Sequence, residues 1–354
     1  MNLINLNKLK EFCGKYNKLY IWGAGNFGLK TVEYLHNQNI IVENIIDNNE
    51  KKVGEIFQGV EVINFEKLLP LNNETSCIVI CSSYFDEIQE QLKSSGISNY
   101  AILDNLLYFM NFEKFYVENE TRFNKMFKNL DKESIKVFRD ILSFRRNGDY
   151  NLITQSVYPQ YFHPKVSPAT GEIIIDGGAF QGDTVEQFKE ALNMECSIHS
   201  FEPTFQNFIE LDKIVKNRKY RNVFVNEMGL GEKSEQLKIS YNEIYPAGSK
   251  ITEDGEEIIQ ITSIDDYVNK NNIGKIDLIK LDVEGFELAT LKGAVTTIET
   301  NRPKLQVCLY HSNEDLIDIY EYLVEQFNHL NYKFYIGHHS DVFWETVLYA
   351  ICEK

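Results

Sequence analysis

The sequence predicts an α/β protein with two doubly wound sheets joined by a helical connector. Short apolar runs alternate with helix-compatible stretches over residues 18–105, and the same alternation returns from Glu172 to the end of the chain. Between the two series, residues 105–147 have helical spacing and contain no glycine. The length of 354 residues agrees with two domains of roughly 150 residues each. We therefore expect domains at residues 1–105 and 166–354, with the connector at 106–165.

Composition and charge limit the class of protein. Hydrophobic residues make up 43% of the chain and charged residues 25%, as in ordinary folded proteins. The 52 acidic residues exceed the 36 basic ones by 16, and no dense Lys/Arg stripe interrupts this excess, so a nucleic acid would be repelled at long range. The sequence has no apolar signal-peptide core at its start and no run of roughly 18 apolar residues. We expect a cytoplasmic protein that has no transmembrane segment and binds no nucleic acid.

The first series opens with a strand, a tight glycine turn and a helix. The strand is predicted at 18–22, and Gly23, Gly25 and Gly28 follow it in the GxGxxG spacing. Later parts of this series predict strands at 42–49, 76–83 and 99–104 and helices at 65–70 and 84–97. Asp47 lies near the end of the strand predicted at 42–49, 19 residues beyond Gly28.

The segment around the glycine turn resembles the small Rossmann-like modules attached to nucleotide-sugar-modifying enzymes, including the amino-terminal domains of sugar acetyltransferases. The resemblance implies a nucleotide site at Gly23, Gly25, Asn26, Gly28 and Asp47. It also implies that Lys51 or Lys52 lies near a phosphate. A purely structural or oligomerising role for this domain is the alternative.

The connector ends in a segment with two prolines and clustered aromatic residues at 155–164, which predicts an ordered loop. The second series then predicts strands at 172–179, 197–203, 222–231, 235–241, 256–263, 276–285, 304–311, 332–339 and 345–352. Helices are predicted from about Asp183 and at 204–217, 263–270, 286–299 and 313–327. The last two strands adjoin through a short loop, so we expect them to form an antiparallel hairpin at the edge of the sheet.

A glycine-rich turn in the second series indicates a ligand site. Asp176 ends a strand, and Gly177, Gly178 and Gly182 follow before the helix that starts at Asp183. Glycines let a backbone approach a ligand, and a helix start offers free N–H groups to an anionic group. Glu202 closes the next strand 26 residues after Asp176, where a carboxylate can accept both hydroxyls of a ribose. The alternative is that Glu202 only caps the following helix.

A second acidic segment, IKLDVEGFE, puts Asp282 and Glu284 at the end of a later strand, with Glu287 beyond Gly285. Ligands of open α/β sheets bind at the carboxyl ends of strands. These side chains are therefore candidates for the same site. The alternative is that they are solvated strand-end carboxylates.

Together these segments resemble the FkbM family of S-adenosylmethionine-dependent methyltransferases. The resemblance covers residues 145–350 and is strongest in KIDLIKLDVEGFELATLKGA, in FEP, in the SIDDYV helix and in RPKLQVCLYHSNEDL. It implies a class I methyltransferase fold with seven core strands and a reversed last strand. The cofactor would be S-adenosylmethionine, with Asp176 attracting its ammonium group, Glu202 holding the ribose, and Asn226, Glu227 and Met228 flanking the adenine.

Methyl transfer to an oxygen needs positioning and one base. We rank Asp282 first as that base, His311 second and Glu284 third. His311 is a candidate because a neutral imidazole accepts a hydroxyl proton near pH 7. A structural role for His311 is the alternative, and Asp282 and Glu284 are alternatively ligands of a divalent cation. We expect no metal, because the sequence identifies no third ligand and the six cysteines form no CxxC pair.

Two positions depart from the common family pattern. Phe180 stands in the glycine turn where many members have Asn, and the strand after the LKGA helix reads VCLYH where many have Glu. The second departure suggests an acceptor site that uses Tyr310 and His311. Four residues of the connector resemble the segment that precedes the core in such members: Arg145, Tyr158, Gln160 and Tyr161. We expect them to cap the site. Packing alone would explain the aromatic residues among them equally well.

The sequence therefore predicts an O-methyltransferase that acts on a hydroxyl of a sugar, nucleotide sugar or glycan precursor. An NAD-dependent sugar oxidoreductase or epimerase that uses the first domain is one alternative, but the sequence shows no YxxxK pair of the short-chain dehydrogenase kind. A non-catalytic protein that binds an adenosyl group or a nucleotide sugar is the other alternative.

Overall fold

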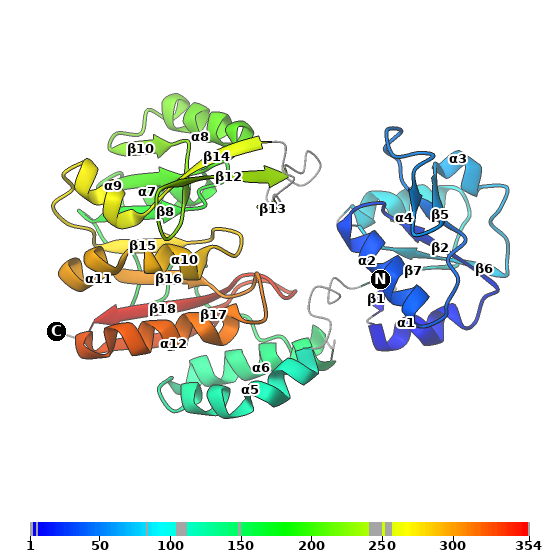
Figure 1. Cartoon of the computed structure of the whole chain (residues 1–354), viewed down its shortest axis with the longest axis horizontal. Helices are drawn as coiled ribbons and strands as arrows, with labels where there is room; N and C mark the ends of the chain where they lie inside the picture. The colour runs from blue at the N-terminus through cyan, green and yellow to red at the C-terminus, as the bar shows by residue number, and fades with distance from the viewer. Residues whose placement is uncertain are drawn as a thin grey trace. The chain divides into compact units, whose positions relative to one another are not determined.

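The computed structural model describes residues 3–4, 6–82, 84–103, 112–147, 150–240, 250–251 and 257–352. The chain divides into two compact units. The first comprises Met1–Phe112 and Arg145–Asp149, and the second comprises Glu113–Phe144 and Tyr150–Lys354. Figure 1 shows the elements of each unit in the order of the chain.

The first unit contains a seven-stranded sheet. In spatial order its strands are β1 (Leu3–Ile4), β7 (Tyr100–Leu103), β6 (Ser76–Ile80), β2 (Lys18–Trp22), β3 (Asn44–Ile46), β5 (Val60–Ile63) and β4 (Ile56–Phe57). All neighbours pair in parallel except β4 and β5. The helices are α1 (Leu6–Cys13), α2 (Asn26–Asn37), α3 (Phe65–Leu68) and α4 (Phe85–Ser94). The central strands β2 and β6 read as continuous apolar runs because helices cover both faces of a parallel sheet.

The strands and helices expected in this unit all form. The structure adds α1, β1 and the hairpin of β4 and β5, which the sequence pattern did not reveal. The two residues of β1 are too few to show a periodicity, and Ile56 and Phe57 of β4 are both exposed.

The second unit is built on another seven-stranded sheet. In spatial order its strands are β10 (Val223–Asn226), β9 (Ser197–Phe201), β8 (Ile173–Gly177), β15 (Leu278–Leu281), β16 (Lys304–Cys308), β18 (Thr346–Cys352) and β17 (Tyr332–His338). Only β18 runs against its neighbours, and it pairs with both β16 and β17. The expected seven strands, with the last one reversed and joined to β17 in a hairpin at the edge, are confirmed.

A smaller sheet of four strands lies in the same unit and was not expected from the sequence. Its order is β11 (Gly229–Leu230), β14 (Glu257–Thr262), β12 (Glu235–Ser240) and β13 (Lys250–Ile251). The strand predicted at 222–231 is therefore divided, so that β10 belongs to the main sheet and β11 to the small one.

The helices of the second unit are α5 (Phe112–Phe127), α6 (Lys132–Asn147), α7 (Asp183–Ala191), α8 (Phe205–Asn217), α9 (Ile264–Lys270), α10 (Glu287–Lys292), α11 (Val295–Asn301) and α12 (Asp315–Phe327). Short 3-10 turns occur at Tyr150–Leu152 and Asn328–Leu330. In the parts of the chain that the structure describes, no helix combines the length and apolarity needed to cross a membrane.

The two helices of the expected connector pack on the second unit. Figure 1 shows α5 and α6 side by side, next to α12. Arg122 of α5 forms ion pairs with Asp318 and Glu321 of α12. The Ser134 hydroxyl at the start of α6 accepts a hydrogen bond from the backbone N–H of Ile336 in β17, at 2.9 Å. These contacts attach both helices to the edge of the main sheet.

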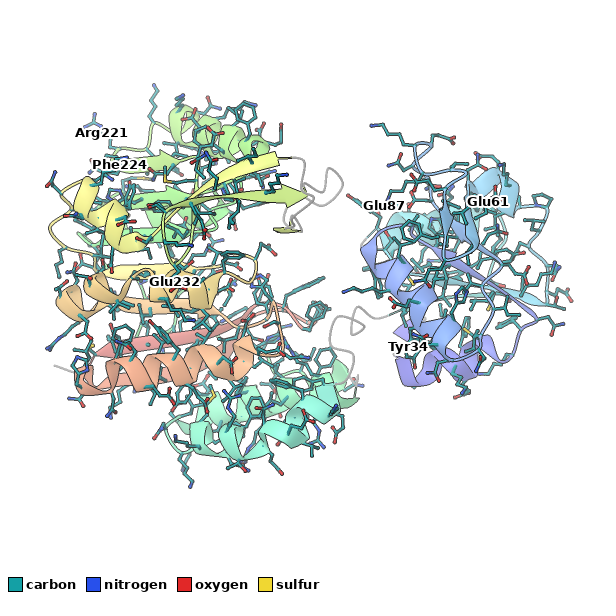
Figure 2. The ribbon with its side chains drawn as sticks, viewed as in Figure 1. Tyr34, Glu61, Glu87, Arg221, Phe224 and Glu232 are labelled. Atoms are coloured by element: carbon teal, nitrogen blue, oxygen red, sulfur yellow. The ribbon has the colours of Figure 1, made fainter. Side chains whose placement is uncertain are left out.

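The single helix predicted at 286–299 is wrong, because the chain breaks there into α10 and α11. Gly293 lies at the break, where a Cβ atom would come within 2.2 Å of the Gly231 carbonyl oxygen and 3.1 Å of the backbone of Glu232, a residue labelled in Figure 2. Close approach of two backbones, which only glycine allows, determines this break.

Candidate functional site

The first part of the site is the glycine turn that joins β8 to α7. Gly178 has φ +71, and a Cβ atom there would lie 1.7 Å from the carbonyl oxygen of Asp282. Gly182 precedes α7 with φ +99. Both conformations favour glycine. The turn therefore lies directly against the end of β15, which brings the two motifs seen in the sequence together.

Phe180 occupies an unfavourable backbone conformation in this turn. Its φ is 45, in the left-handed region that asparagine tolerates better than other side chains do. This geometry gives a physical reason why Asn is common at this position among the proteins that the sequence resembles. In this chain the turn is tied down by the Phe180 N–H, which donates to Glu202 Oε2 at 3.1 Å.

Glu202 lies just beyond β9 and is 6% exposed. Its Oε1 accepts hydrogen bonds from the backbone N–H of Thr204 at 3.1 Å and from the Thr204 hydroxyl at 2.5 Å. Burial raises the pKa of Glu202. Oε2 accepts from Phe180, and a carboxylate oxygen has room for a second donor. Glu202 thus supports both the glycine turn and the start of α8, and Oε2 retains capacity for one ligand hydroxyl.

Asp176 is fully buried beneath the turn and faces Lys280 of the neighbouring strand β15. The Lys280 Nζ lies 3.1 Å from Asp176 Oδ1 and also donates to the carbonyl oxygens of Gly177 and Gly178. Burial raises the pKa of Asp176. Burial also opposes the charge of Lys280, but Asp176 and Asp282 outweigh it and raise the pKa of Lys280. In this structure the carboxylate of Asp176 therefore meets an internal lysine, and its contact with a cofactor ammonium group stays a prediction.

The remaining expected cofactor residues line the same edge of the sheet. Asp183 is exposed as the first residue of α7. Asn226 ends β10, and its side-chain amide donates to the carbonyl oxygens of Ser200 and Phe224, the latter labelled in Figure 2. Glu227 is exposed and Met228 is half-buried, between β10 and β11.

Asp282 is the best-supported of the candidate catalytic groups. Tyr310 donates its hydroxyl to Asp282 Oδ1 at 2.7 Å, and Tyr161 donates its hydroxyl to Oδ2 at 3.0 Å. Burial opposes the charge of this carboxylate, but Lys280 and His311 lower the pKa of Asp282. Asp282 is therefore a fixed, ionised group at the carboxyl end of β15.

His311 lies among three carboxylates. Its Nδ1 is 3.0 Å from Glu287 Oε1, and its Nε2 is 3.5 Å from Asp282 Oδ1 and 3.6 Å from Glu284 Oε2. Burial disfavours the charged ring, but Glu287, Asp282 and Glu284 outweigh burial and raise the pKa of His311 to about 10. These surroundings disagree with the expectation of a neutral imidazole near pH 7. They favour an imidazolium that holds the carboxylates together.

Two acidic residues complete this cluster. Glu284 is exposed, has φ 54, and follows Asp282 by two residues. Partial burial, with Asp282 and Glu287 nearby, raises the pKa of Glu284 to about 7. Glu287 begins α10 and is fully buried, and its Oε1 also accepts from the Val283 N–H at 2.8 Å.

Glu287 was noted in the acidic segment but received no role. Helical spacing places it on the buried face of α10, a position that is usually apolar. A carboxylate at such a position was the signal in the sequence. A carboxylate oxygen of Glu287 lies within 4.8 Å of a carboxylate oxygen of Asp282 and of a ring nitrogen of His311, and all three atoms are potential metal ligands. The structure thus supplies the third ligand whose absence was the reason to expect no metal.

The connector residues differ in their relation to the site. Tyr161 contacts Asp282 directly, and Gln160 donates to the Tyr161 hydroxyl at 3.1 Å. Tyr158 instead packs against the rings of His163 and His339. Arg145, near the end of α6, lies over the ring of Phe112 at the start of α5, and both residues lie in the short parts of these helices that belong to the first unit.

The glycine turn of the first unit has the expected shape. Gly23 has φ +122, and a Cβ atom on Gly28 would lie 1.7 Å from the Gly23 carbonyl oxygen. Asp47 Oδ2 accepts a hydrogen bond from the Ala24 N–H at 2.7 Å. Lys52 Nζ lies 3.7 Å from the same carboxylate and donates to the Ala24 carbonyl oxygen. Asp47 and Lys52 therefore hold the turn itself, and a role in nucleotide binding stays a prediction. The backbone of α2 begins at Asn26, beyond Gly25.

The second unit combines a glycine turn, an acidic residue after the next strand and a polar cluster after β15. Comparison with known proteins finds similarity to methyltransferases. Residues 176–334 match the family described as Methyltransferase FkbM domain. Residues 15–103 match a family described as C2185-like, N-terminal.

Individual relatives agree with this similarity. The methyltransferase FkbM from Methylobacillus flagellatus KT has a similar fold, with a TM-score of 0.67 and 19% sequence identity over 97% of this chain and 93% of that one. The hexuronic acid methyltransferase AglP of Haloferax volcanii is 28% identical over 109 residues, which are 30% of this chain and 44% of that protein. The chain therefore spans less than half the length of this curated relative.

Proposed function

We propose that the protein is an S-adenosylmethionine-dependent O-methyltransferase that acts on a hydroxyl of a sugar or glycan precursor. The observation that carries the proposal is Asp282, fixed by the hydroxyls of Tyr161 and Tyr310 at the carboxyl end of β15, directly against the glycine turn. Both sheets are proposed to be Rossmann-like, the second with the class I methyltransferase arrangement.

The residues around the turn suit the proposed cofactor. Gly177 and Gly178 leave no room for a Cβ atom, so the turn packs directly against the end of β15 and its backbone would be close to a ligand bound there. Oε2 of Glu202 has capacity for a ribose hydroxyl. Asn226, Glu227 and Met228 would flank the adenine, and Asp183 would lie near the amino-acid end, where Lys280 and Asp176 form the floor.

The proposed reaction needs a donor, an oriented hydroxyl and a proton acceptor. S-adenosylmethionine supplies the methyl group: the acceptor oxygen forms the new O–C bond, the C–S bond breaks, and its electron pair stays on sulfur. Asp282 orients the acceptor hydroxyl as a hydrogen-bond acceptor. Asp282 ranks first as the base from the sequence alone, but its pKa is lowered, so we instead assign the hydroxyl proton to Glu284, the third candidate, whose pKa is raised to about 7. His311, held as an imidazolium, fixes both carboxylates.

The acceptor class is proposed from two observations. The relative of about one quarter identity, AglP, is named for methylation of a hexuronic acid. In addition, the site presents several carboxylate oxygens, which accept hydrogen bonds from sugar hydroxyls. The first unit is proposed to bind the nucleotide part of a nucleotide sugar near Gly23, Gly25, Asn26, Gly28 and Asp47.

Calorimetric titration of the full chain with S-adenosylhomocysteine, NAD and UDP-sugars tests the proposal. We expect S-adenosylhomocysteine to bind and the variant Gly178→Val to lose this binding, because the added side chain collides with Asp282. Methyl transfer from radiolabelled S-adenosylmethionine to a panel of sugars and nucleotide sugars then identifies the acceptor. Binding of NAD without binding of S-adenosylhomocysteine would contradict the proposal and favour an oxidoreductase.

A further inference from the structure

The cluster beyond β15 brings three potential ligand atoms, two oxygens and one nitrogen, to one place. One carboxylate oxygen of Asp282, one of Glu287 and one ring nitrogen of His311 all lie within 4.8 Å of one another. Ligands bound about 2.1 Å from a common ion lie roughly 3 to 3.5 Å apart. The two short distances use different nitrogens of the His311 ring: Nδ1 lies 3.0 Å from Glu287 Oε1, and Nε2 lies 3.5 Å from Asp282 Oδ1. An ion binds only one of these nitrogens, so one carboxylate is already in this range and a side-chain movement must bring in the other.

The cluster holds more acidic than basic side chains. Three carboxylates, those of Asp282, Glu284 and Glu287, lie around a single imidazole, and two of them are largely buried. Lys280 helps to keep Asp282 ionised, but it also pairs with Asp176 and two carbonyl oxygens. Buried anions without a matching cation are costly. An additional cation would therefore stabilise Glu287, for which His311 provides the ion pair in the described part of the chain.

Glu287 provides an independent indication of a missing partner. Its side chain is 0% exposed, and its Oε2 has no hydrogen-bond partner among the residues that the structure describes. Both ring nitrogens of His311, whose side chain is 10% exposed, also lack a hydrogen bond of good geometry, although carboxylates lie near them. Buried polar atoms are normally satisfied, so these three atoms indicate a ligand that completes them.

We propose that Asp282, Glu287 and His311 bind a divalent transition-metal ion, with Glu284 at the edge of the site. The ion takes the place of the proton that charges the His311 ring in the metal-free protein. One imidazole with two carboxylates suits ions such as Mn²⁺ or Zn²⁺ better than Ca²⁺ or Mg²⁺, which prefer oxygen ligands alone. Three protein ligands leave coordination positions open. The following role rests on the proposed methyl transfer. The acceptor hydroxyl would bind at an open position of the ion, the ion would lower the pKa of that hydroxyl, and Glu284 would then remove the proton more easily.

Metal binding is testable without cofactor or acceptor. Mn²⁺ is titrated into the full, metal-stripped chain, and the loss of the free-ion electron paramagnetic resonance signal reports binding. We expect one site, with an affinity at least tenfold lower in Glu287→Gln and in His311→Gln. Competition by Zn²⁺ and Mg²⁺ ranks the ions.

The surface pair of His329 and Glu299 offers a matched control. Its Nε2 to Oε2 distance is 2.8 Å, but the pair is not one of the three-ligand groups found in the described part of the chain. Glu299→Gln should leave Mn²⁺ binding unchanged. Should Glu287→Gln fail to fold, as judged by circular dichroism, the partly exposed Asp282→Asn replaces it.

No binding of Mn²⁺ or Zn²⁺, or equal affinity in wild type and folded ligand variants, would overturn the inference. Because the titration contains no S-adenosylmethionine, it tests the metal site independently of the proposed function. Metal binding without methyl transfer would refute only the function, and methyl transfer without metal binding would refute only the metal site.

Discussion

At the scale of single residues, the site is built on three unusual backbone conformations. Tyr161, Phe180 and Glu284 all have positive φ, at 66, 45 and 54, although none is glycine. Such conformations are costly and persist where the surroundings enforce them, often at functional sites. Tyr161 holds Asp282, Phe180 holds Glu202, and Glu284 faces His311. These three lie at the candidate site, although positive φ also occurs elsewhere in the described chain, for example at Gln58 and Lys219.

Glu202→Ala should weaken the binding of S-adenosylhomocysteine by about 1–3 kcal/mol, because a charged hydrogen-bond partner is lost. Isothermal titration calorimetry measures the change. Glu210→Ala, on the exposed face of α8 with a surface ion pair to Lys213, is the matched control and should bind as wild type does. Unchanged affinity in the Glu202 variant would remove this residue from the cofactor site.

Tyr310→Phe should lower kcat by about tenfold, since Asp282 loses the hydroxyl donor at 2.7 Å that fixes its orientation. The KM for the acceptor should change less. Tyr332→Phe removes a comparable buried hydrogen bond, from a hydroxyl to the Pro303 carbonyl oxygen at 2.7 Å, away from the carboxylates. Steady-state kinetics that show the same loss in both variants would indicate a general effect on stability rather than a role in the site.

At the scale of elements, long periodic segments were predictable and their interruptions were not. The strands β8, β9, β15 and β16 read as apolar runs that end in polar residues, so the carboxyl edge of the sheet and its candidates Asp176, Glu202 and Asp282 followed from the sequence. The break between α10 and α11 did not, because it depends on the contact of Gly293 with Gly231, which is remote in sequence. The neutral state expected of His311 failed for the same reason: Glu287 reaches it from another element.

Two buried histidines and one half-buried histidine make the second unit sensitive to acid. Burial lowers the pKa values of His163, His199 and His339 to about 4 each. In the unfolded chain histidine titrates near 6.5, so the unfolded state binds more protons between pH 6.5 and 4. The contribution of these three histidines to the free energy of unfolding should be highest above pH 6.5 and fall as the pH is lowered through this range, by about 1–3 kcal/mol for each histidine.

His199 allows this expectation to be tested on one contact between elements. Its ring in β9 stacks on Phe224 of β10 at 4.6 Å, and its Nδ1 lies 2.9 Å from the Tyr267 hydroxyl of α9. Urea unfolding of His199→Gln between pH 7.5 and 4.5 should show a shallower loss of stability than wild type. An identical pH dependence in the two proteins would show that this histidine is not the source.

At the scale of the whole molecule, the two seven-stranded sheets were predictable because each series of strands and helices is continuous in the chain, whereas the small four-stranded sheet was not predicted. The assignment of α5 and α6 was less accessible from sequence. Their helical spacing predicted a connector, whereas the ion pairs of Arg122 with α12 attach them to the second unit. Side-chain pairing between segments almost 200 residues apart leaves no local pattern: Arg122 and Asp318 are separated by 196 positions.

The division into two units predicts that damage to one leaves the ligand binding of the other intact. Gly28→Ala should destabilise the first unit, since the new Cβ atom would lie 1.7 Å from the Gly23 carbonyl oxygen. Gly25→Ala is the matched control in the same turn, because a Cβ atom there meets nothing within 4 Å. Differential scanning calorimetry should show a lowered transition for Gly28→Ala alone, with loss of any UDP-sugar binding, while the affinity for S-adenosylhomocysteine stays that of wild type. A parallel loss of S-adenosylhomocysteine binding would instead show that the cofactor site depends on the first unit, and the two proposed binding functions would then have to be treated as one.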